Sequence, residues 1–247
     1  MQLYTLGTSH GNHTPGRFAT SSLLVGEKYG YMIDAGEPAS AQVFRLGIPY
    51  ETIRAVFITH MHDDHTSGLT ALTKAILKYP NEDVHTDIYF PDESAIVPFR
   101  NWQAAVHITD PAHVLTYHTA TAEGIVYENE EIKVRAIPTL HMDGGAYPSF
   151  AYLIETADKR ILFTGDLTPD LRDFPKVEGH IDVCVCEATH YKPVLALPLF
   201  EKMDFGKLIF NHLHELYIGN GEDAFLENYK SLPYPVFVSH DLEAFRL

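Results

Sequence analysis

The chain has 247 residues, of which 45% are hydrophobic, so it is long and apolar enough to bury a substantial core. Its formal net charge of −15 argues against binding to long RNA or DNA, because contacts of Lys and Arg with phosphates supply most of that affinity. The chain opens without the basic and apolar segments of a secretory signal, and no apolar run approaches the ~20 residues that span a bilayer, so we expect a cytoplasmic protein without a membrane partner.

Short apolar runs separated by turns organise the first half of the chain. They predict strands at residues 2–6, 21–25, 29–34, 55–59 and 88–90. The helical spacing of apolar residues predicts helices at residues 39–46, at 93–105, and from Leu69 to just before Pro80. This half therefore mixes strands with helices.

The second half begins with strands and then alternates. Strands are expected at residues 114–117, 124–127, 131–137, 150–156, 160–164, 181–186, 208–210 and 236–238, and helices near 194–203 and 222–229. Two packed sheets with helices outside are the simplest α/β architecture that buries all these faces, within one domain spanning residues 1–247. Cys184 and Cys186 alternate along one expected strand, which favours reduced core thiols over a disulfide.

The strongest functional signal is the segment 60–65, HMHDDH, which directly follows a buried strand. Side chains at a strand end and in the turn that follows can converge. Imidazole nitrogens and carboxylate oxygens suit zinc, and each His can bind through one ring nitrogen while the other donates to an acceptor. The segment therefore predicts a metal site that contains His60, His62, Asp64 and His65.

The order His-x-His-x-Asp-His after a strand is the signature of the metallo-β-lactamase fold superfamily, which the chain resembles along almost its whole length. Segments 33–36 (IDAG), 140–141 (LH) and 163–166 (FTGD) follow in the family's order. The resemblance implies an αββα sandwich of two mixed β-sheets flanked by helices. It also implies two divalent metal ions, zinc by default, with manganese or iron as alternatives.

The resemblance assigns these ions to specific side chains. One metal ion would be held by His60, His62 and His141, and the second by Asp64 and His65, with Asp166 between the two and Asp34 as a buried support. Two histidines that follow a strand, His212 and His214, compete as the final ligand, and His240 is a third candidate. In the tRNase Z branch the ligand follows a strand and one polar residue, which favours His212 and leaves His214 as a candidate acid in the cleft.

Two further segments are similar to the tRNase Z branch. Segment 6–11 (LGTSHG) resembles its opening Gly-Thr loop, and segment 186–189 (CEAT) resembles its His-Glu-Ala-Thr motif, with Cys186 in place of the histidine. The resemblance implies that Glu187 orients a proton-donating histidine, for which His190 is a candidate. His10 and His13 lie in the opening loop and could border the cleft, but loop histidines are usually solvated.

The chain also departs from that branch. In tRNase Z enzymes of the common bacterial type, a long arm that clamps tRNA lies between the histidine equivalent to His141 and the aspartate equivalent to Asp166. Residues 142–165 leave no room for such an arm. The Ser/Thr-bearing histidine motif expected between Glu187 and His212 is not evident either. Together with the acidic charge, these departures argue against tRNA processing.

The sequence thus predicts a dinuclear metal-dependent hydrolase, specifically a phosphodiesterase that cleaves a small phosphodiester or cyclic phosphate through a metal-bridging hydroxide. Asp64 would accept a proton as well as bind metal. Thioester or lactone hydrolysis, as in glyoxalase II-like and lactonase members, is the alternative among enzymes, and a non-catalytic binding module on the same fold is the alternative from another class. We expect a small-molecule substrate. The sequence leaves open whether the protein forms a homo-oligomer.

Overall fold

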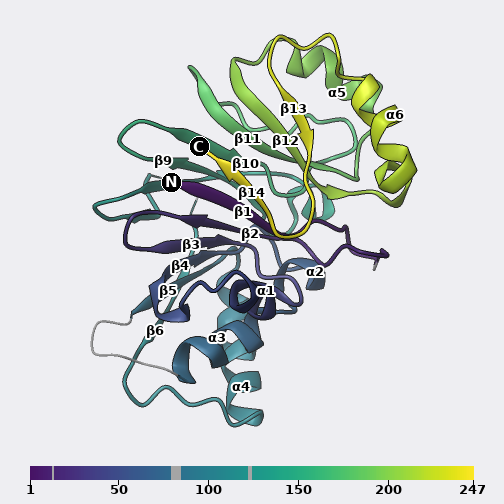
Figure 1. Ribbon diagram of the computed structural model, residues 1–247. Helices are drawn as coiled ribbons and strands as arrows, with labels where there is room; N and C mark the ends of the chain where they lie inside the picture. Colours follow the sequence, from purple (N-terminus) through teal and green to yellow (C-terminus); the bar gives the residue numbers. More distant parts are fainter. Residues whose placement is uncertain (13, 79–84, 122–123) are drawn as a thin grey trace.

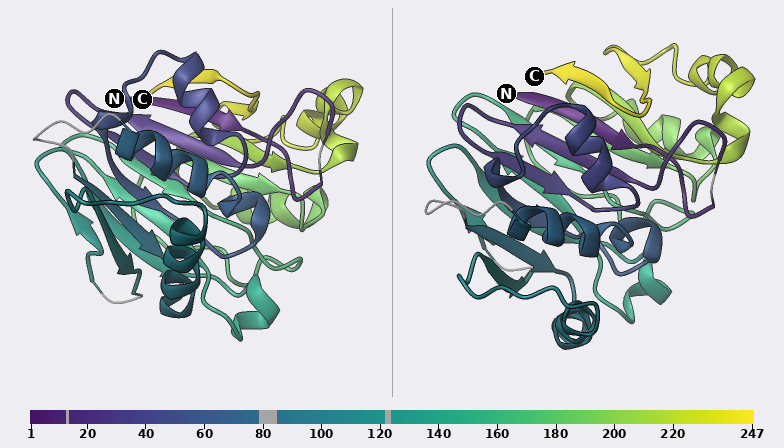
Figure 2. Two further views of the ribbon diagram at one scale, coloured as in Figure 1. Left: turned by 90° about the horizontal axis from the view of Figure 1, so that it is seen from below. Right: turned by 60° about the horizontal axis from the view of Figure 1, so that its bottom comes forward.

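The computed structural model describes residues 1–12, 14–78, 85–121 and 124–247 (Figure 1). Within these ranges the strands form two seven-stranded mixed sheets that pack face to face, as the sequence predicts. The first sheet has the order β14-β1-β2-β3-β4-β5-β6, and the second has the order β13-β12-β11-β10-β9-β8-β7. Helices cover the outer face of each sheet, which completes an αββα sandwich (Figure 2).

The first sheet joins the chain's N-terminal strands to its last strand. Its strands are β1 (Gln2–Gly7), β2 (Ser21–Val25), β3 (Gly30–Ile33), β4 (Ile53–Phe57), β5 (Thr86–Phe90), β6 (Leu115–Thr119) and β14 (Glu243–Arg246). The strands of the second sheet are β7 (Tyr127–Glu128), β8 (Lys133–Pro138), β9 (Phe150–Glu155), β10 (Arg160–Phe163), β11 (Ile181–Ala188), β12 (Phe205–Leu213) and β13 (Val236–Val238).

The helices are short and lie between the strands. They are α1 (Ala39–Arg45), α2 (Asp63–Thr66), α3 (Leu69–Lys78), α4 (Ile96–Ala105), α5 (Pro193–Phe200) and α6 (Glu222–Glu227), with 3₁₀ turns η1 (Tyr50–Thr52), η2 (Glu93–Ala95), η3 (Met142–Gly145), η4 (Glu215–Tyr217) and η5 (Gly219–Gly221). No helix among the described residues is long and apolar enough to cross a membrane.

Element order agrees with the sequence-based prediction, but some bounds differ. The helix expected at 93–105 is divided into η2 and α4, and the strand expected at 124–127 is reduced to β7. Strand β14 was not predicted; it forms because its backbone pairs antiparallel with β1, a contact between the two ends of the chain that local sequence does not encode. The metal-motif loop also contains a helical turn, α2.

The core has three layers. One apolar cluster lies between the sheets and includes Phe57, Tyr152 and Ile209. A second packs α1 and α3 against the outer face of the first sheet, and a third packs α5 and α6 against the second sheet. Cys184 and Cys186 are buried free thiols in this third cluster, as expected.

Parallel pairing sets the position of the site. Strands β3 and β4 run parallel in the first sheet, and β10, β11 and β12 run parallel in the second. The carboxyl ends of parallel neighbours meet at one edge of a sheet. The segments that leave these ends carry the metal motif and most of its partners, and His141 follows β8, so the fold brings these residues to one rim of the sandwich.

Candidate metal centre

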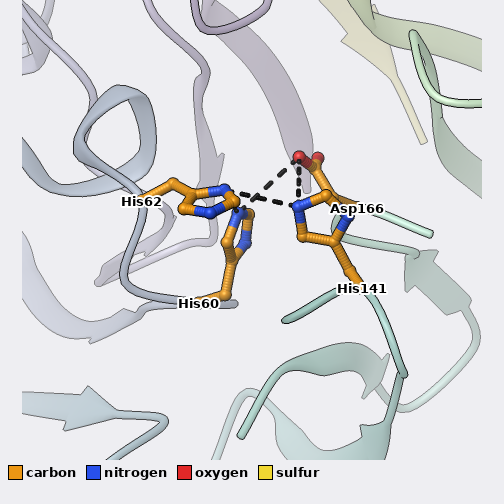
Figure 3. Close-up of side chains that lie close together, drawn as sticks. All are labelled: His60, His62, His141 and Asp166. Carbon is orange, nitrogen blue, oxygen red and sulfur yellow. Dashed lines mark hydrogen bonds and ion pairs between the residues drawn. The ribbon is translucent and has the colours of Figure 1, made fainter. Parts of the chain in front are cut away.

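Three histidines and one carboxylate converge in the first donor cluster (Figure 3). His60 Nε2 lies 2.9 Å from His62 Nδ1, and His141 Nε2 lies 3.3 Å from the same His62 atom. Asp166 Oδ2 is 3.6 Å from His60 Nε2 and 3.6 Å from His141 Nε2. His60 and His62 follow β4, His141 follows β8 and Asp166 follows β10, so the cluster joins both sheets.

A second donor cluster lies beside the first and contains Asp64, His65 and His212. Asp64 Oδ2 is 3.0 Å from His212 Nε2 and 3.5 Å from His65 Nε2. The same Asp166 Oδ2 atom is 3.5 Å from His65 Nε2 and 3.6 Å from His212 Nε2. One carboxylate oxygen therefore faces an imidazole pair from each cluster.

The donor atoms fit divalent cations. Ligands ~2.0–2.1 Å from a tetrahedrally coordinated zinc ion lie roughly 3.3–3.4 Å from one another, close to the separations in both clusters. His65 Nε2 and Asp166 Oδ1 are buried without a hydrogen-bond partner among the described residues. Buried polar atoms rarely stay unpaired unless a ligand, ion or water serves them. The residues present thus fit two metal ions.

The charge states of Asp166 and His60 suit metal binding. Burial disfavours the charged form of Asp166, but the neighbouring imidazoles of His212, His65 and His60 outweigh it and hold the pKa of the carboxyl well below its usual range. Burial, together with His65, lowers the pKa of His60 well below its usual value. An ionised carboxylate and a neutral imidazole are the forms that bind metal.

Asp34 is buried and contacts His65, in the supporting position that the family resemblance implies. It is 5% exposed, and its Oδ2 lies 2.8 Å from His65 Nδ1. Its Oδ1 accepts hydrogen bonds from the Thr59 backbone N–H at 2.8 Å and the Thr59 hydroxyl at 3.0 Å. With Nδ1 held by Asp34, His65 presents Nε2 to the centre.

Glycines let the supporting loops approach each other closely. A Cβ at Gly36 would lie 2.2 Å from the Asp64 carbonyl oxygen, and one at Gly68 would lie 2.7 Å from the Gly36 carbonyl oxygen. Both contacts are with backbone atoms, which cannot move aside as a flexible side chain can. The loop after β3 therefore packs directly on α2, which carries Asp64 and His65.

A strained residue aims the last imidazole. His212 has a φ of 50°, in the left-handed region, and the pairing of β11 with β12 shifts register beside it. Bulges of this kind redirect a side chain near active sites. The Thr189 hydroxyl donates to the His212 carbonyl oxygen and fixes this conformation. His212 thereby faces Asp64, whereas His214 accepts a hydrogen bond from the Leu216 N–H and lies outside both clusters.

Glu187 and His190 form a pair beside the centre. Glu187 is 3% exposed, and its carboxylate accepts from the backbone N–H groups of Leu167, Thr189 and His190. His190 Nδ1 lies 3.1 Å from Glu187 Oε1 and 3.7 Å from Asp166 Oδ2. Burial disfavours the charged ring, but the hydrogen bond and charge of Glu187 raise the pKa of His190 to about 9.

The other histidines considered from the sequence lie in different environments. His240 is exposed and lies 3.1 Å from Glu222, away from the centre. His10 was expected to be solvated, but it is only 7% exposed, because its loop packs against the end of β12. His13 lies outside the described residues. Sequence reasoning missed the burial of His10, since a Gly-rich loop gives no local sign of what covers it.

Three comparisons place the chain among known proteins. A family model described as anti-Pycsar protein Apyc1 matches residues 1–191. Ribonuclease Z from Synechococcus sp. (strain CC9902) is 30% identical over 164 residues, which cover 63% of this chain and 49% of that enzyme. The chain thus spans about half the length of the curated relatives it matches.

Solved structures share the whole fold at low identity. The metallo-β-lactamase fold protein YhfI from Bacillus subtilis superposes with a TM-score of 0.79 at 16% identity, over 99% of both chains. The short form of human tRNase Z superposes with a TM-score of 0.76 at 19% identity, over 100% of this chain and 99% of that one. The predicted metallo-β-lactamase fold is confirmed.

The geometry predicts different effects for the two histidines after β12. His212→Ala should lower the metal content of protein purified without chelator, because it removes a donor 3.0 Å from Asp64. His214→Ala should retain the wild-type metal content. Elemental analysis of both variants, with circular dichroism as the folding control, measures the difference. Metal loss in His214→Ala alone would instead identify His214 as the ligand.

Asp166 should affect both clusters at once. Asp166→Ala should reduce metal content from about two equivalents to below about one, because its Oδ2 faces donors of both sites. His141→Ala is the matched control, since it belongs to the first cluster only and should leave roughly one equivalent. Elemental analysis after reconstitution with excess zinc tests this. Equal losses in the two variants would contradict the shared role of Asp166.

Proposed function

The chain belongs to the family described as anti-Pycsar protein Apyc1, and from this premise we propose that it is a dinuclear metal-dependent phosphodiesterase acting on a small phosphodiester or cyclic phosphate. The observation that carries the proposal is the single Asp166 oxygen that faces two donor clusters. A similar enzyme, ribonuclease Z, has a name that describes cleavage of RNA, whose linkages are phosphodiesters. This supports phosphorus ester chemistry over other ester classes.

Seven side chains would hold the two metal ions. They are His60, His62, Asp64, His65, His141, Asp166 and His212. When bound, two such ions supply a water acidic enough to act as a nucleophile near neutral pH and offset the charge on phosphoryl oxygens. The imidazole-rich set favours zinc, and manganese or iron are alternatives.

The protein's own residues would donate and accept protons during hydrolysis. Glu187 holds Nδ1 of His190 at 3.1 Å, which leaves Nε2 on the opposite edge of the ring for the substrate. The His190 side chain is 29% exposed and packs 4.5 Å from the His141 ring, between centroids, so it borders the centre and is accessible. We assign it the role of donating a proton to the leaving oxygen. Asp64, whose carboxylate belongs to the second cluster, can also accept a proton.

Local chain length and charge support a small substrate. Residues 142–165 form η3, β9 and β10 with short connections, so they provide no arm that could clamp a folded RNA. The net charge of −15 also opposes a long polyanion, because few Lys and Arg residues remain to neutralise its phosphates. A cyclic phosphate or a small diester needs neither feature.

The substrate class can be tested directly. Zinc- or manganese-loaded protein should hydrolyse bis(p-nitrophenyl) phosphate and small cyclic phosphates, because two cations stabilise phosphoryl oxygens whatever the leaving group. Precursor tRNA should be cleaved poorly. The same assay includes a thioester and a lactone, and Asp166→Ala serves as the metal-deficient control. Turnover of the thioester or lactone with inert diesters would overturn the phosphodiesterase, and efficient tRNA cleavage would overturn the small substrate.

The role of His190 predicts a dependence on the leaving group. His190→Ala should slow hydrolysis of a cyclic phosphate, whose leaving alkoxide needs a proton, by roughly 10²–10⁴-fold. It should slow release of p-nitrophenolate by less than ~10-fold, because that anion leaves without protonation. Metal content should stay at the wild-type level. Equal losses on both substrates, together with lost metal, would instead make His190 a ligand, which its 3.7 Å distance from Asp166 Oδ2 allows.

A further inference from the structure

His10 is a buried residue at the border of the metal centre. It follows β1, and its neighbour Ser9 forms a parallel bridge with Leu213, the residue after His212. The Leu213 N–H donates to the Thr8 carbonyl oxygen at 3.0 Å. These contacts fasten the opening loop to the end of β12. His10 is only 7% exposed as a result.

The ring nitrogens of His10 have different surroundings. Nδ1 accepts a hydrogen bond from the Asn12 backbone N–H at 3.0 Å. Burial, with His212 and His214 nearby, lowers the pKa of His10, which favours the neutral ring. A neutral ring that accepts at Nδ1 carries its proton on Nε2. The loop backbone thus fixes the tautomer.

The Nε2–H group has no acceptor. Nε2 is buried and forms no hydrogen bond with any residue that the structure describes. The nearest carboxylate oxygen, Glu215 Oε2, lies 4.0 Å away, beyond hydrogen-bond distance, on a side chain that is 60% exposed. A buried donor without a partner is rare in proteins and calls for an explanation.

The surroundings of His10 indicate what its acceptor is. A Cβ placed on Gly11, the next residue, would lie 3.6 Å from Asp64 Oδ2, so the loop contacts the second donor cluster. The His214 ring packs beside His10, with 5.5 Å between centroids. His214 also accepts a backbone N–H at Nδ1, which leaves its own proton on Nε2. Two imidazole rings that accept at Nδ1 therefore lie side by side at the edge of the centre.

We propose that His10 is a substrate-binding residue whose Nε2–H donates a hydrogen bond to a non-bridging phosphoryl oxygen of the ligand at the metal centre. The assignment rests on the proposed function for the chemical class of the ligand, a phosphorus oxyanion. A neutral buried donor suits an anionic acceptor, because hydrogen bonds to charged groups are stronger than those between neutral groups. It also adds no positive charge that would repel the metal ions.

Phosphate affinity tests the proposal without requiring turnover. Isothermal titration of zinc-loaded protein with inorganic phosphate should give a Kd about 10- to 100-fold higher in His10→Leu, because a hydrogen bond to an anion is lost. His10→Gln retains a terminal N–H donor and should stay within about threefold of wild type. His180→Leu, an exposed histidine paired with Asp204, is the control and should leave the Kd unchanged. Metal content is measured for every variant.

A spectroscopic measurement covers the case in which His10→Leu fails to fold. Long-range ¹H–¹⁵N spectra of zinc-loaded protein should show the His10 ring protonated at Nε2 and accepting at Nδ1, with its signals assigned by their loss in His10→Gln. Phosphate should shift that Nε2 proton downfield. A proton on Nδ1, or no response to phosphate in spectra and titration alike, would overturn the proposal.

Glu215 supplies the competing acceptor and its own test. If the anion accepts the hydrogen bond from His10, Glu215→Gln should leave phosphate affinity unchanged or improve it. The substitution removes a negative charge that would repel the phosphate. If Glu215 is the partner, His10→Leu and Glu215→Gln should destabilise the protein alike without changing phosphate affinity, and the proposal fails. Phosphate binding that depends on His10 in a protein inert toward diesters would instead reject only the phosphodiesterase. Diester turnover that is unaffected in His10→Leu would reject only the His10 assignment.

Discussion

One carboxylate oxygen lies close to imidazoles that come from both β-sheets. Asp166 Oδ2 lies 3.5 to 3.6 Å from imidazole nitrogens of His60, His65, His141 and His212. Two of these imidazoles come from segments that leave the first sheet and two from the second, while Asp166 itself follows β10. The site exists only when both sheets are packed, because each supplies part of every donor cluster. Metal binding and the packing of the sandwich are therefore thermodynamically linked.

Without bound metal ions, this arrangement of side chains costs free energy of folding. Imidazoles and carboxylates are desolvated, and among the described residues three buried polar atoms of the clusters (His65 Nε2, Asp166 Oδ1 and His212 Nδ1) have no hydrogen-bond partner. His212 also adopts a left-handed backbone conformation. The supporting contacts all act on backbone or on the far ring nitrogen: Asp34 on His65, Thr189 on His212, and close packing of the Gly36 loop on α2. Such contacts fix the orientation of the ligand side chains and leave the atoms that would bind metal free to do so. The cluster thus keeps its capacity for cations, whose binding offsets the strain.

How much of this is predictable from sequence depends on how local each feature is. The motif at 60–65 and the order of strands are local, and they predict the αββα sandwich and the segments that carry the donor residues. The choice between His212 and His214 needed a resemblance, because the bulge that redirects His212 arises from pairing with β11. Strand β14 and the burial of His10 depend on contacts between the two ends of the chain, which no local pattern encodes.

The cations of the chain also bear on how the site recognises anions. Arg17, the buried arginine of the opening loop, directs its guanidinium to Thr8, the Ser239 carbonyl oxygen and Glu222, so it is committed to holding that loop against the C-terminal segment. With a net charge of −15 around it, a centre without metal ions would repel a phosphate. Beside the protonated His190 ring, positive charge at the site would therefore come from bound metal ions, and the proposed donor His10 would add direction. Under the proposed function, metal ions would therefore bind before the phosphate, and the loop that Arg17 holds would be part of the substrate site.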